Sequence, residues 1–197
     1  MGLIIEDGTG SGYKVAVDDQ NRMHTRATAR PEAEDININS GYTFLTSMNL
    51  QTVTTSESPV YYVINNDPQN SFVIEHVSVG SNGGSTTFNK TQIFRVYFGP
   101  SAPSANNTIV IPRSLNTNYS AKANVTCNIW NGTGTGMTVS SNGTYVAGVI
   151  VSIGRTPIEF GECGIVVGPG QAILFTLQAQ VESATNMVNV YGFVIIP

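Results

Sequence analysis

The sequence predicts an all-β fold, in which a β-sandwich or barrel follows a small N-terminal β meander. Three observations support this prediction. From Tyr42 onward, runs rich in Val, Ile, Thr and aromatic residues alternate with turn sequences such as Asn82-Gly83-Gly84 and Asn142-Gly143. Helical periodicity is nearly absent. The 197 residues are enough for one buried core plus an appendage, which we assign to residues 41–197 and 1–40, respectively.

The N-terminal arm, residues 1–40, is predicted to contain three short strands. Residues 3–6 form the first, and three glycines mark the loop that follows it. Residues 13–18 alternate polar and apolar side chains with the period of two that strands require, and residues 22–27 can return beside them. A sheet this small buries too little surface to be stable alone, so we expect the arm to dock on a partner.

The body is predicted to be an uninterrupted series of short strands, which is typical of a β-sandwich or barrel. Residues 46–54 are less clear than the rest and also fit a short helix. The last run ends in a continuous apolar sequence, which is typical of a central strand. The expected strands are residues 42–53, 60–64, 72–79, 86–98, 108–111, 123–130, 145–153, 165–167, 172–181 and 187–196.

Charged side chains are concentrated in the arm. Of the 9 Lys and Arg and the 13 Asp and Glu residues, half lie within the first 35 positions. Since most catalytic and metal-binding chemistry uses titratable groups, this distribution favours assembly or adhesion over turnover. The net charge of −4 also argues against a nucleic-acid partner, which requires a basic surface.

Signals for membrane insertion or secretion are not found in the sequence. No apolar run reaches the roughly 18 residues of a membrane span, so no membrane partner is expected. The first six residues lack the basic start and apolar centre of a signal peptide, which predicts synthesis in a cytosol. In that compartment Cys127 and Cys163 are expected to be buried thiols, with one disulfide across the sandwich as the alternative.

Few residue combinations in the chain suit catalysis. The chain has two histidines, His24 and His76, that could serve as a general base for a nucleophile. His76 shares a strand face with Ser78, but strand geometry separates the two by about 7 Å, which is too far for a direct hydrogen bond. Glu159 and Glu162 are a weak candidate for a glycosidase pair, because carboxylates in turns are usually solvated. No Cys and His cluster suits a metal, and no phosphate-binding motif is complete. We therefore expect a non-enzymatic protein without a catalytic, metal or cofactor site.

The arm carries the candidate partner-binding residues. Arg22, Arg26 and Arg30 recur at a spacing of four and can act as bidentate forks for carboxylates on a partner surface. Tyr13 and Lys14, on the preceding predicted strand, belong to the same candidate set. The alternative is a solvated arm, in which the acidic residues at positions 32, 34 and 35 balance the arginines.

An alternative binding site lies in the body. Tyr119, Trp130 and Tyr145 lie near Asn- and Gly-rich loops, where an aromatic ring can stack on a sugar. Such recognition needs no titratable residue, so it suits the charge-poor body. The competing interpretation is that Trp130 ends a strand and caps the core.

Several stretches of the chain resemble virion proteins of tailed bacteriophages. The arm contributes residues 5–18 (IEDGTGSGYKVAVD), followed by Asn21-Arg22. The body contributes residues 62–66 (YVINN) with 72–77 (FVIEHV), then residues 168–172 (GPGQA) and a Val-Tyr-Gly-Phe ending. The resemblance spans most of the chain. It implies a capsid cement or decoration protein of jelly-roll type, often trimeric in this family, and it brings no catalytic residues.

The resemblance also implies a partner and a location. The expected partner is the major capsid protein, on the outer surface of a phage head assembled in the host cytoplasm. The arm would bridge neighbouring shell subunits by strand addition and through its arginines, and the arms of a homo-oligomer would bind as one multivalent unit. The alternative function is a host-recognition or carbohydrate-binding module of a phage fibre or tail.

Overall fold

The computed structural model describes residues 16–17, 23–24, 42–82, 91–114, 116, 118, 120, 122–151, 154–159, 164–180 and 184–195. The chain divides into two compact units, Met1–Pro31 and Glu32–Pro197. In the first unit, β1 (Ala16–Val17) pairs antiparallel with β2 (Met23–His24). These two strands fall within the second and third strands predicted for the arm, and the first predicted strand lies outside the described residues.

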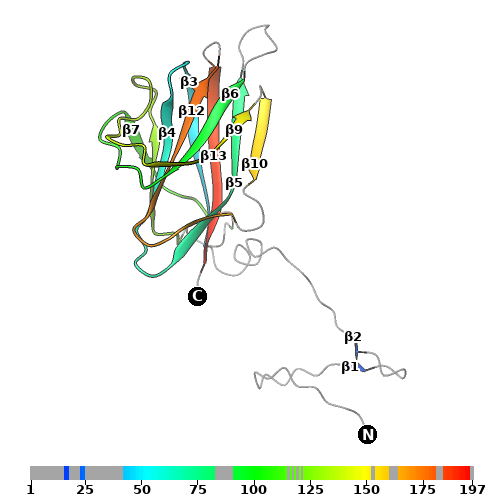
Figure 1. Cartoon of the computed structure of the whole chain (residues 1–197). Helices are drawn as coiled ribbons and strands as arrows, with labels where there is room; N and C mark the ends of the chain where they lie inside the picture. The colour runs from blue at the N-terminus through cyan, green and yellow to red at the C-terminus, as the bar shows by residue number, and fades with distance from the viewer. Residues whose placement is uncertain are drawn as a thin grey trace. The chain divides into compact units, whose positions relative to one another are not determined.

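The larger unit is built from two antiparallel sheets that pack against each other (Figure 1). In spatial order, the first sheet contains β10 (Gly154–Glu159), β5 (Ser71–Asn82), β13 (Ala184–Ile195) and β3 (Thr43–Val53), and β11 (Ile165–Val167) also pairs with β5. The second contains β7 (Asn107–Val110), β8 (Val125–Trp130), β4 (Ser58–Asn65), β12 (Ala172–Ala179), β6 (Gln92–Phe98) and β9 (Thr144–Val151). In the described part of the chain we find no helix with the length and apolar character needed to cross a membrane.

Eight strands follow the pairing order of a jelly roll. With β3, β4, β5, β6, β9, β10, β12 and β13 counted from first to eighth, the first sheet pairs the first with the eighth, the eighth with the third and the third with the sixth. The second sheet pairs the second with the seventh, the seventh with the fourth and the fourth with the fifth. Strands β7 and β8 extend the second sheet beyond β4. The predicted all-β, jelly-roll-like sandwich is therefore confirmed.

The hydrophobic core lies between the two sheets. In β6, the buried Phe94 alternates with the less buried Arg95 and Tyr97, so one side of the strand faces the core and the other faces outward. A polar contact also crosses the core, because Gln92 of β6 donates from Nε2 to Oδ1 of Asn186 on β13 at 2.7 Å. Both amides are fully buried. This hydrogen bond links the two sheets across the core.

The structure corrects the sequence prediction at β10. Gly154 and Pro157 argue against a strand, so the sequence does not predict this element. Because β10 is at the end of its sheet, one side needs no hydrogen-bonding partner and a proline is tolerated there. Residues 46–54 do not form a helix, because β3 continues as a strand to Val53. The C-terminal strand β13 lies between β3 and β5, which confirms the predicted central position.

Cys127 of β8 is a buried free thiol, as predicted. Burial raises the pKa of this thiol to about 11, so it remains protonated at neutral pH and is a poor nucleophile. Beside it, the buried hydroxyls of Thr46 and Tyr61 share a hydrogen bond. Cys163 lies outside the described residues.

Candidate functional site

Most of the predicted binding residues lie outside the described residues. His24 is described only as a strand residue opposite Ala16, and Glu159 only as a strand residue opposite His76. The predictions for the arm therefore stay predictions. The residues not described are Tyr13, Lys14, Arg22, Arg26 and Arg30 of the arm, and Tyr119 and Glu162 of the body.

The two described members of the sugar-binding set, Trp130 and Tyr145, have different environments. Trp130 is 2% exposed, and its indole Nε1–H donates to the carbonyl oxygen of Thr133 at 2.8 Å. A buried ring offers no free face on which a sugar can stack, so Trp130 caps the core. Tyr145 is 56% exposed and lies on β9. Of these two rings, Tyr145 is the one available to a ligand.

Ser78, on the strand that carries His76, is not an open nucleophile. Ser78 is 1% exposed, and its hydroxyl oxygen accepts a hydrogen bond from Nδ2 of Asn189 at 3.1 Å. A serine nucleophile must reach a substrate, so this buried hydroxyl has a structural role. Among the described residues, no group of three or more His, Cys, Asp or Glu side chains is placed to hold a metal ion.

The most distinctive surface feature is strand β9. Its first seven residues are all exposed. They include the large apolar side chains of Tyr145, Val146, Val149 and Ile150, which are exposed by 56, 46, 41 and 67%. Among the described strands, β9 pairs with β6 alone and ends the second sheet. Its other backbone edge can therefore accept a further strand.

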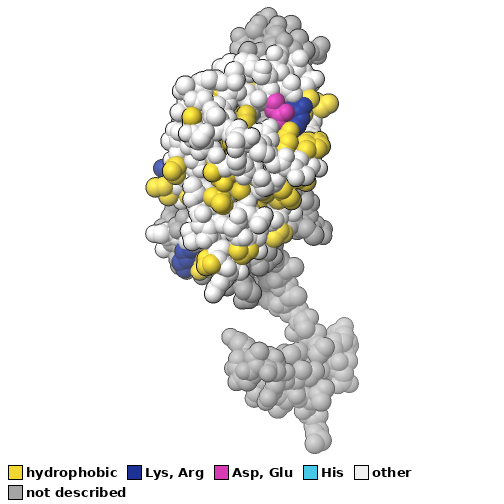
Figure 2. Space-filling model, turned by 60° about the vertical axis from the view of Figure 1, so that its left-hand side comes forward, with side chains coloured by type: hydrophobic (Ala, Val, Ile, Leu, Met, Phe, Trp, Pro, Cys, Tyr) yellow, Lys and Arg dark blue, Asp and Glu magenta, His cyan; other side chains and the backbone are white. Residues whose placement is uncertain are grey.

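The described part of the face seen in Figure 2 is apolar in patches and poor in charge. Figure 2 shows apolar side chains gathered in several patches among uncharged polar ones, with few charged side chains on that face. Ile109 of β7 and Ile111 just after it are 65 and 84% exposed. With Leu45 of β3 and Arg113 they line a groove of about 790 Å³. The main chains of Leu45 and Arg113 exchange two hydrogen bonds, with N···O distances of 2.9 and 3.1 Å.

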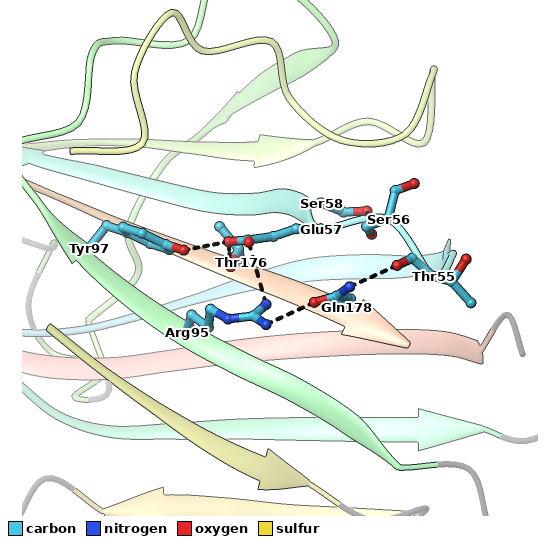
Figure 3. A network of polar contacts seen from close by, with 8 residues as sticks. All are labelled: Thr55, Ser56, Glu57, Ser58, Arg95, Tyr97, Thr176 and Gln178. Atoms are coloured by element: carbon cyan, nitrogen blue, oxygen red, sulfur yellow. Dashed lines mark hydrogen bonds and ion pairs between the residues drawn. The ribbon is translucent and has the colours of Figure 1, made fainter. Parts of the chain in front are cut away.

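A polar network lies on the outward-facing side of β6, next to β9 (Figure 3). Glu57, which precedes β4, accepts hydrogen bonds at Oε1 from the hydroxyls of Tyr97 and Thr176, both at 2.7 Å. Its Oε2 lies 3.5 Å from Nη1 of Arg95. Nη2 of Arg95 donates to Oε1 of Gln178 at 2.8 Å. One carboxylate and one guanidinium thus hold β6, β12 and the start of β4 together.

The chemistry of this network suits positioning rather than catalysis. Desolvation by burial raises the pKa of Tyr97 to about 12, and the hydrogen bond to Glu57 is the next cause. The phenol therefore stays protonated and keeps donating to Glu57 until strongly alkaline pH. One oxygen of Glu57 already accepts two hydrogen bonds, and the other faces Arg95, so the carboxylate has little capacity left to act as a base.

The network reaches β9 through Tyr97. The rings of Tyr97 and Tyr145 meet edge to face, with centroids 5.7 Å apart and planes at 67°. The side chain of Tyr145 also lies along its own strand, because a Cβ added at Gly148 would be 2.8 Å from the tyrosine hydroxyl oxygen. Arg95 lies opposite Gly148 in the pairing of β6 with β9. The exposed edge strand with its neighbours on β6 is called the β9 surface, which consists of Arg95, Tyr97, Tyr145, Val146, Val149 and Ile150. Ile150 lies on the outward face of the sheet with Arg95 and Tyr97, whereas Val149, opposite Phe94, lies on the other face.

Comparisons with protein-family models, with curated proteins and with solved structures give no match to this chain. The fold is a jelly-roll β-sandwich, a class that serves many unrelated functions. What this molecule does must therefore be inferred from the β9 surface and from the residues of the arm.

The sequence predicts a strand at residues 145–153 but not its exposure. Apolar residues occupy consecutive positions there, a pattern that usually indicates a strand buried on both faces. Glu57 lies between two serines and has the sequence context of a solvated turn. The one signal in the sequence for this network is that Glu57 and Arg95 are among the few charged residues of the body.

Replacing Glu57 with glutamine is expected to lower the free energy of unfolding by about 1–3 kcal/mol. The amide keeps the size of the side chain, but it leaves the guanidinium of Arg95, 19% exposed, without its counter-ion. Urea unfolding followed by the fluorescence of Trp130 measures the change. Adding Arg95→Met should cost less than the sum of the two single changes, whereas additive losses would show that the pair does not act together.

Proposed function

We propose that this chain is a non-enzymatic structural protein of a tailed-bacteriophage virion, a decoration protein that binds the outer surface of the capsid and stabilises it by bridging shell subunits. The observation that carries the proposal is the β9 surface, an exposed apolar edge on a charge-poor jelly-roll body. Exposed apolar edges of this kind mark contacts between protein chains. The resemblance of residues 5–18 and 168–172 to phage virion proteins supports the choice of particle.

In this proposal the two units have different tasks. The N-terminal unit holds the chain on the major capsid protein, and the body contacts further copies in a homo-oligomer, a trimer by resemblance. Several arms of one oligomer then bind together, so that weak individual contacts add up to tight binding. No cofactor, nucleic acid or membrane takes part. The arm residues assigned to the capsid contact are Tyr13, Lys14, Arg22, Arg26 and Arg30.

The copy number of this chain in purified intact phage particles tests the proposal. Quantitative mass spectrometry should find an amount comparable with that of the major capsid protein, because a decoration protein repeats over the whole shell lattice. The internal control is a tail protein of known stoichiometry in the same particles. Complete absence of the chain from the particles would contradict the proposal.

Recognition of a host or a carbohydrate by a phage tail or fibre is the second candidate function. The observation in its favour is Tyr145, an exposed aromatic ring that contacts Tyr97 at the margin of the Glu57 and Arg95 network. A ratio of only a few copies per particle would favour this candidate over decoration. Glycan binding that is lost in Tyr145→Ala would then support it.

A further inference from the structure

In the described part of the chain, strand β9 is a sheet edge with little protection against the addition of a strand. Its one departure from a regular edge is an irregularity at residues 145–147 in the pairing with β6. β10 contains Pro157, which has no backbone N–H to donate, and the charged Arg155. β7 is four residues long, and the edge of β3 is met by the main chain of Arg113 at Leu45. β9 is eight residues long and contains no Pro, Lys, Arg, Asp or Glu. Monomeric proteins rarely leave such an edge open.

The charges around β9 suit a second copy of the same chain. A two-fold contact brings each side chain near its own counterpart, so any net charge at the contact repels. β9 itself is uncharged. Beside it, Arg95 and Glu57 lie 3.5 Å apart and neutralise each other. A strongly charged partner would find no free counter-charge in the Arg95–Glu57 pair. A second copy of the chain would not be repelled by this pair, because its two charges neutralise each other.

The apolar residues of β9 also suit antiparallel pairing about a two-fold axis. A residue on such an axis faces its own copy. Gly148 brings no side chain of its own to the axis, and the hydroxyl of Tyr145 lies beside it. With Gly148 on the axis, Ala147 of one copy faces Val149 of the other. Val146, which lies at the irregularity in the pairing with β6, comes next to Ile150 of the other copy. Each of these exposed aliphatic residues then has an aliphatic neighbour. Centring the axis on Ala147 would instead place Val146 opposite a glycine.

We propose that two copies of this chain associate by antiparallel pairing of their β9 strands, with Gly148 on the two-fold axis. The pairing joins the two six-stranded sheets into one continuous sheet and covers Val146, Val149 and Ile150. It goes beyond the proposed function, because it is a property of the purified chain and does not depend on a phage particle. It joins copies in pairs, and for the body it replaces the trimer that the resemblance implies.

Sedimentation velocity of the full chain over a roughly hundredfold concentration range tests this pairing. We expect a monomer–dimer equilibrium in which Ile150→Lys raises the dissociation constant at least about tenfold, because the contact would bury an unpaired ammonium group. Ile111→Lys makes the same substitution at an exposed site outside β9 and should leave the dissociation constant unchanged. Both positions are exposed, at 67 and 84%, so both variants should unfold at the temperature of the unchanged chain.

Complementary charges test the register. A mixture of Ile150→Lys chains with Val146→Glu chains should recover a dimer, because the two introduced charges come next to each other when Gly148 is on the axis. Loss of the dimer in Ile150→Lys and its recovery in the mixture would support the proposal. A monomer at every concentration, or an oligomer that Ile150→Lys leaves unchanged, would overturn it. Loss without recovery in the mixture would overturn the register centred on Gly148.

Discussion

Replacing Phe175 with alanine is expected to lower the free energy of unfolding by about 3–5 kcal/mol. Phe175 is fully buried on β12, a strand that is hydrogen-bonded to β4 on one side and to β6 on the other. Its ring stacks on Tyr61 with centroids 5.7 Å apart and lies 5.2 Å from the ring of Phe94. Since both neighbouring strands hold β12, the backbone cannot move in to fill the space, and a cavity remains. Domains are stable by only about 5–15 kcal/mol, so this loss is a large share of the total.

Urea unfolding followed by intrinsic fluorescence measures this effect. Trp130 is the only tryptophan of the chain, and it is buried on β8 in the same sheet as Phe175, so it reports on the sandwich itself. The matched control is Phe98→Ala on β6, the same substitution at a ring that is 40% exposed. The control should cost less than half as much, because solvent already reaches that ring. Equal losses at the two positions would contradict the central place assigned to Phe175.

The positions of most strands can be predicted because turns and burial leave local signals in the sequence. Asn142-Gly143 marks the turn before β9, which begins at the next residue, and the continuous apolar run near the C-terminus indicates the central strand β13. β10 leaves no such signal. Its Pro157 is compatible with a strand only at the edge of a sheet, and edge position depends on the tertiary structure rather than on local sequence.

The β9 surface cannot be predicted from local sequence because it depends on contacts between distant residues. Glu57 bonds to Tyr97, 40 positions later, and to Thr176, 119 positions later. Nothing near Glu57 in the sequence indicates either partner. Apolar strands such as β12 and β9 also have similar compositions, although β12 is almost entirely buried and β9 is almost entirely exposed. Which of them ends the sheet is decided by the pairing order of the whole jelly roll.

Deleting residues 1–35 is expected to abolish binding to phage heads while leaving the sandwich folded. The deletion removes the compact unit Met1–Pro31. It keeps every strand of the two large sheets, because the earliest of these strands, β3, begins at Thr43. Under the proposed function, the removed unit carries Arg22, Arg26 and Arg30, which bind carboxylates on the shell. Because all arms of an oligomer are lost together, the multivalent gain is lost as well, and binding should weaken at least about a hundredfold.

Cosedimentation of the purified chain with heads that lack it measures this binding, and the fluorescence of Trp130 reports the fold of the truncated chain. The matched control is a full-length chain in which Arg22, Arg26 and Arg30 are replaced by glutamine, which keeps the backbone of the arm and removes its charges. Binding that survives the deletion would contradict the division of tasks between the two units. The deletion and the control differ in whether the arm's main chain is present. The gap between their affinities therefore measures what strand addition contributes beyond the arginines.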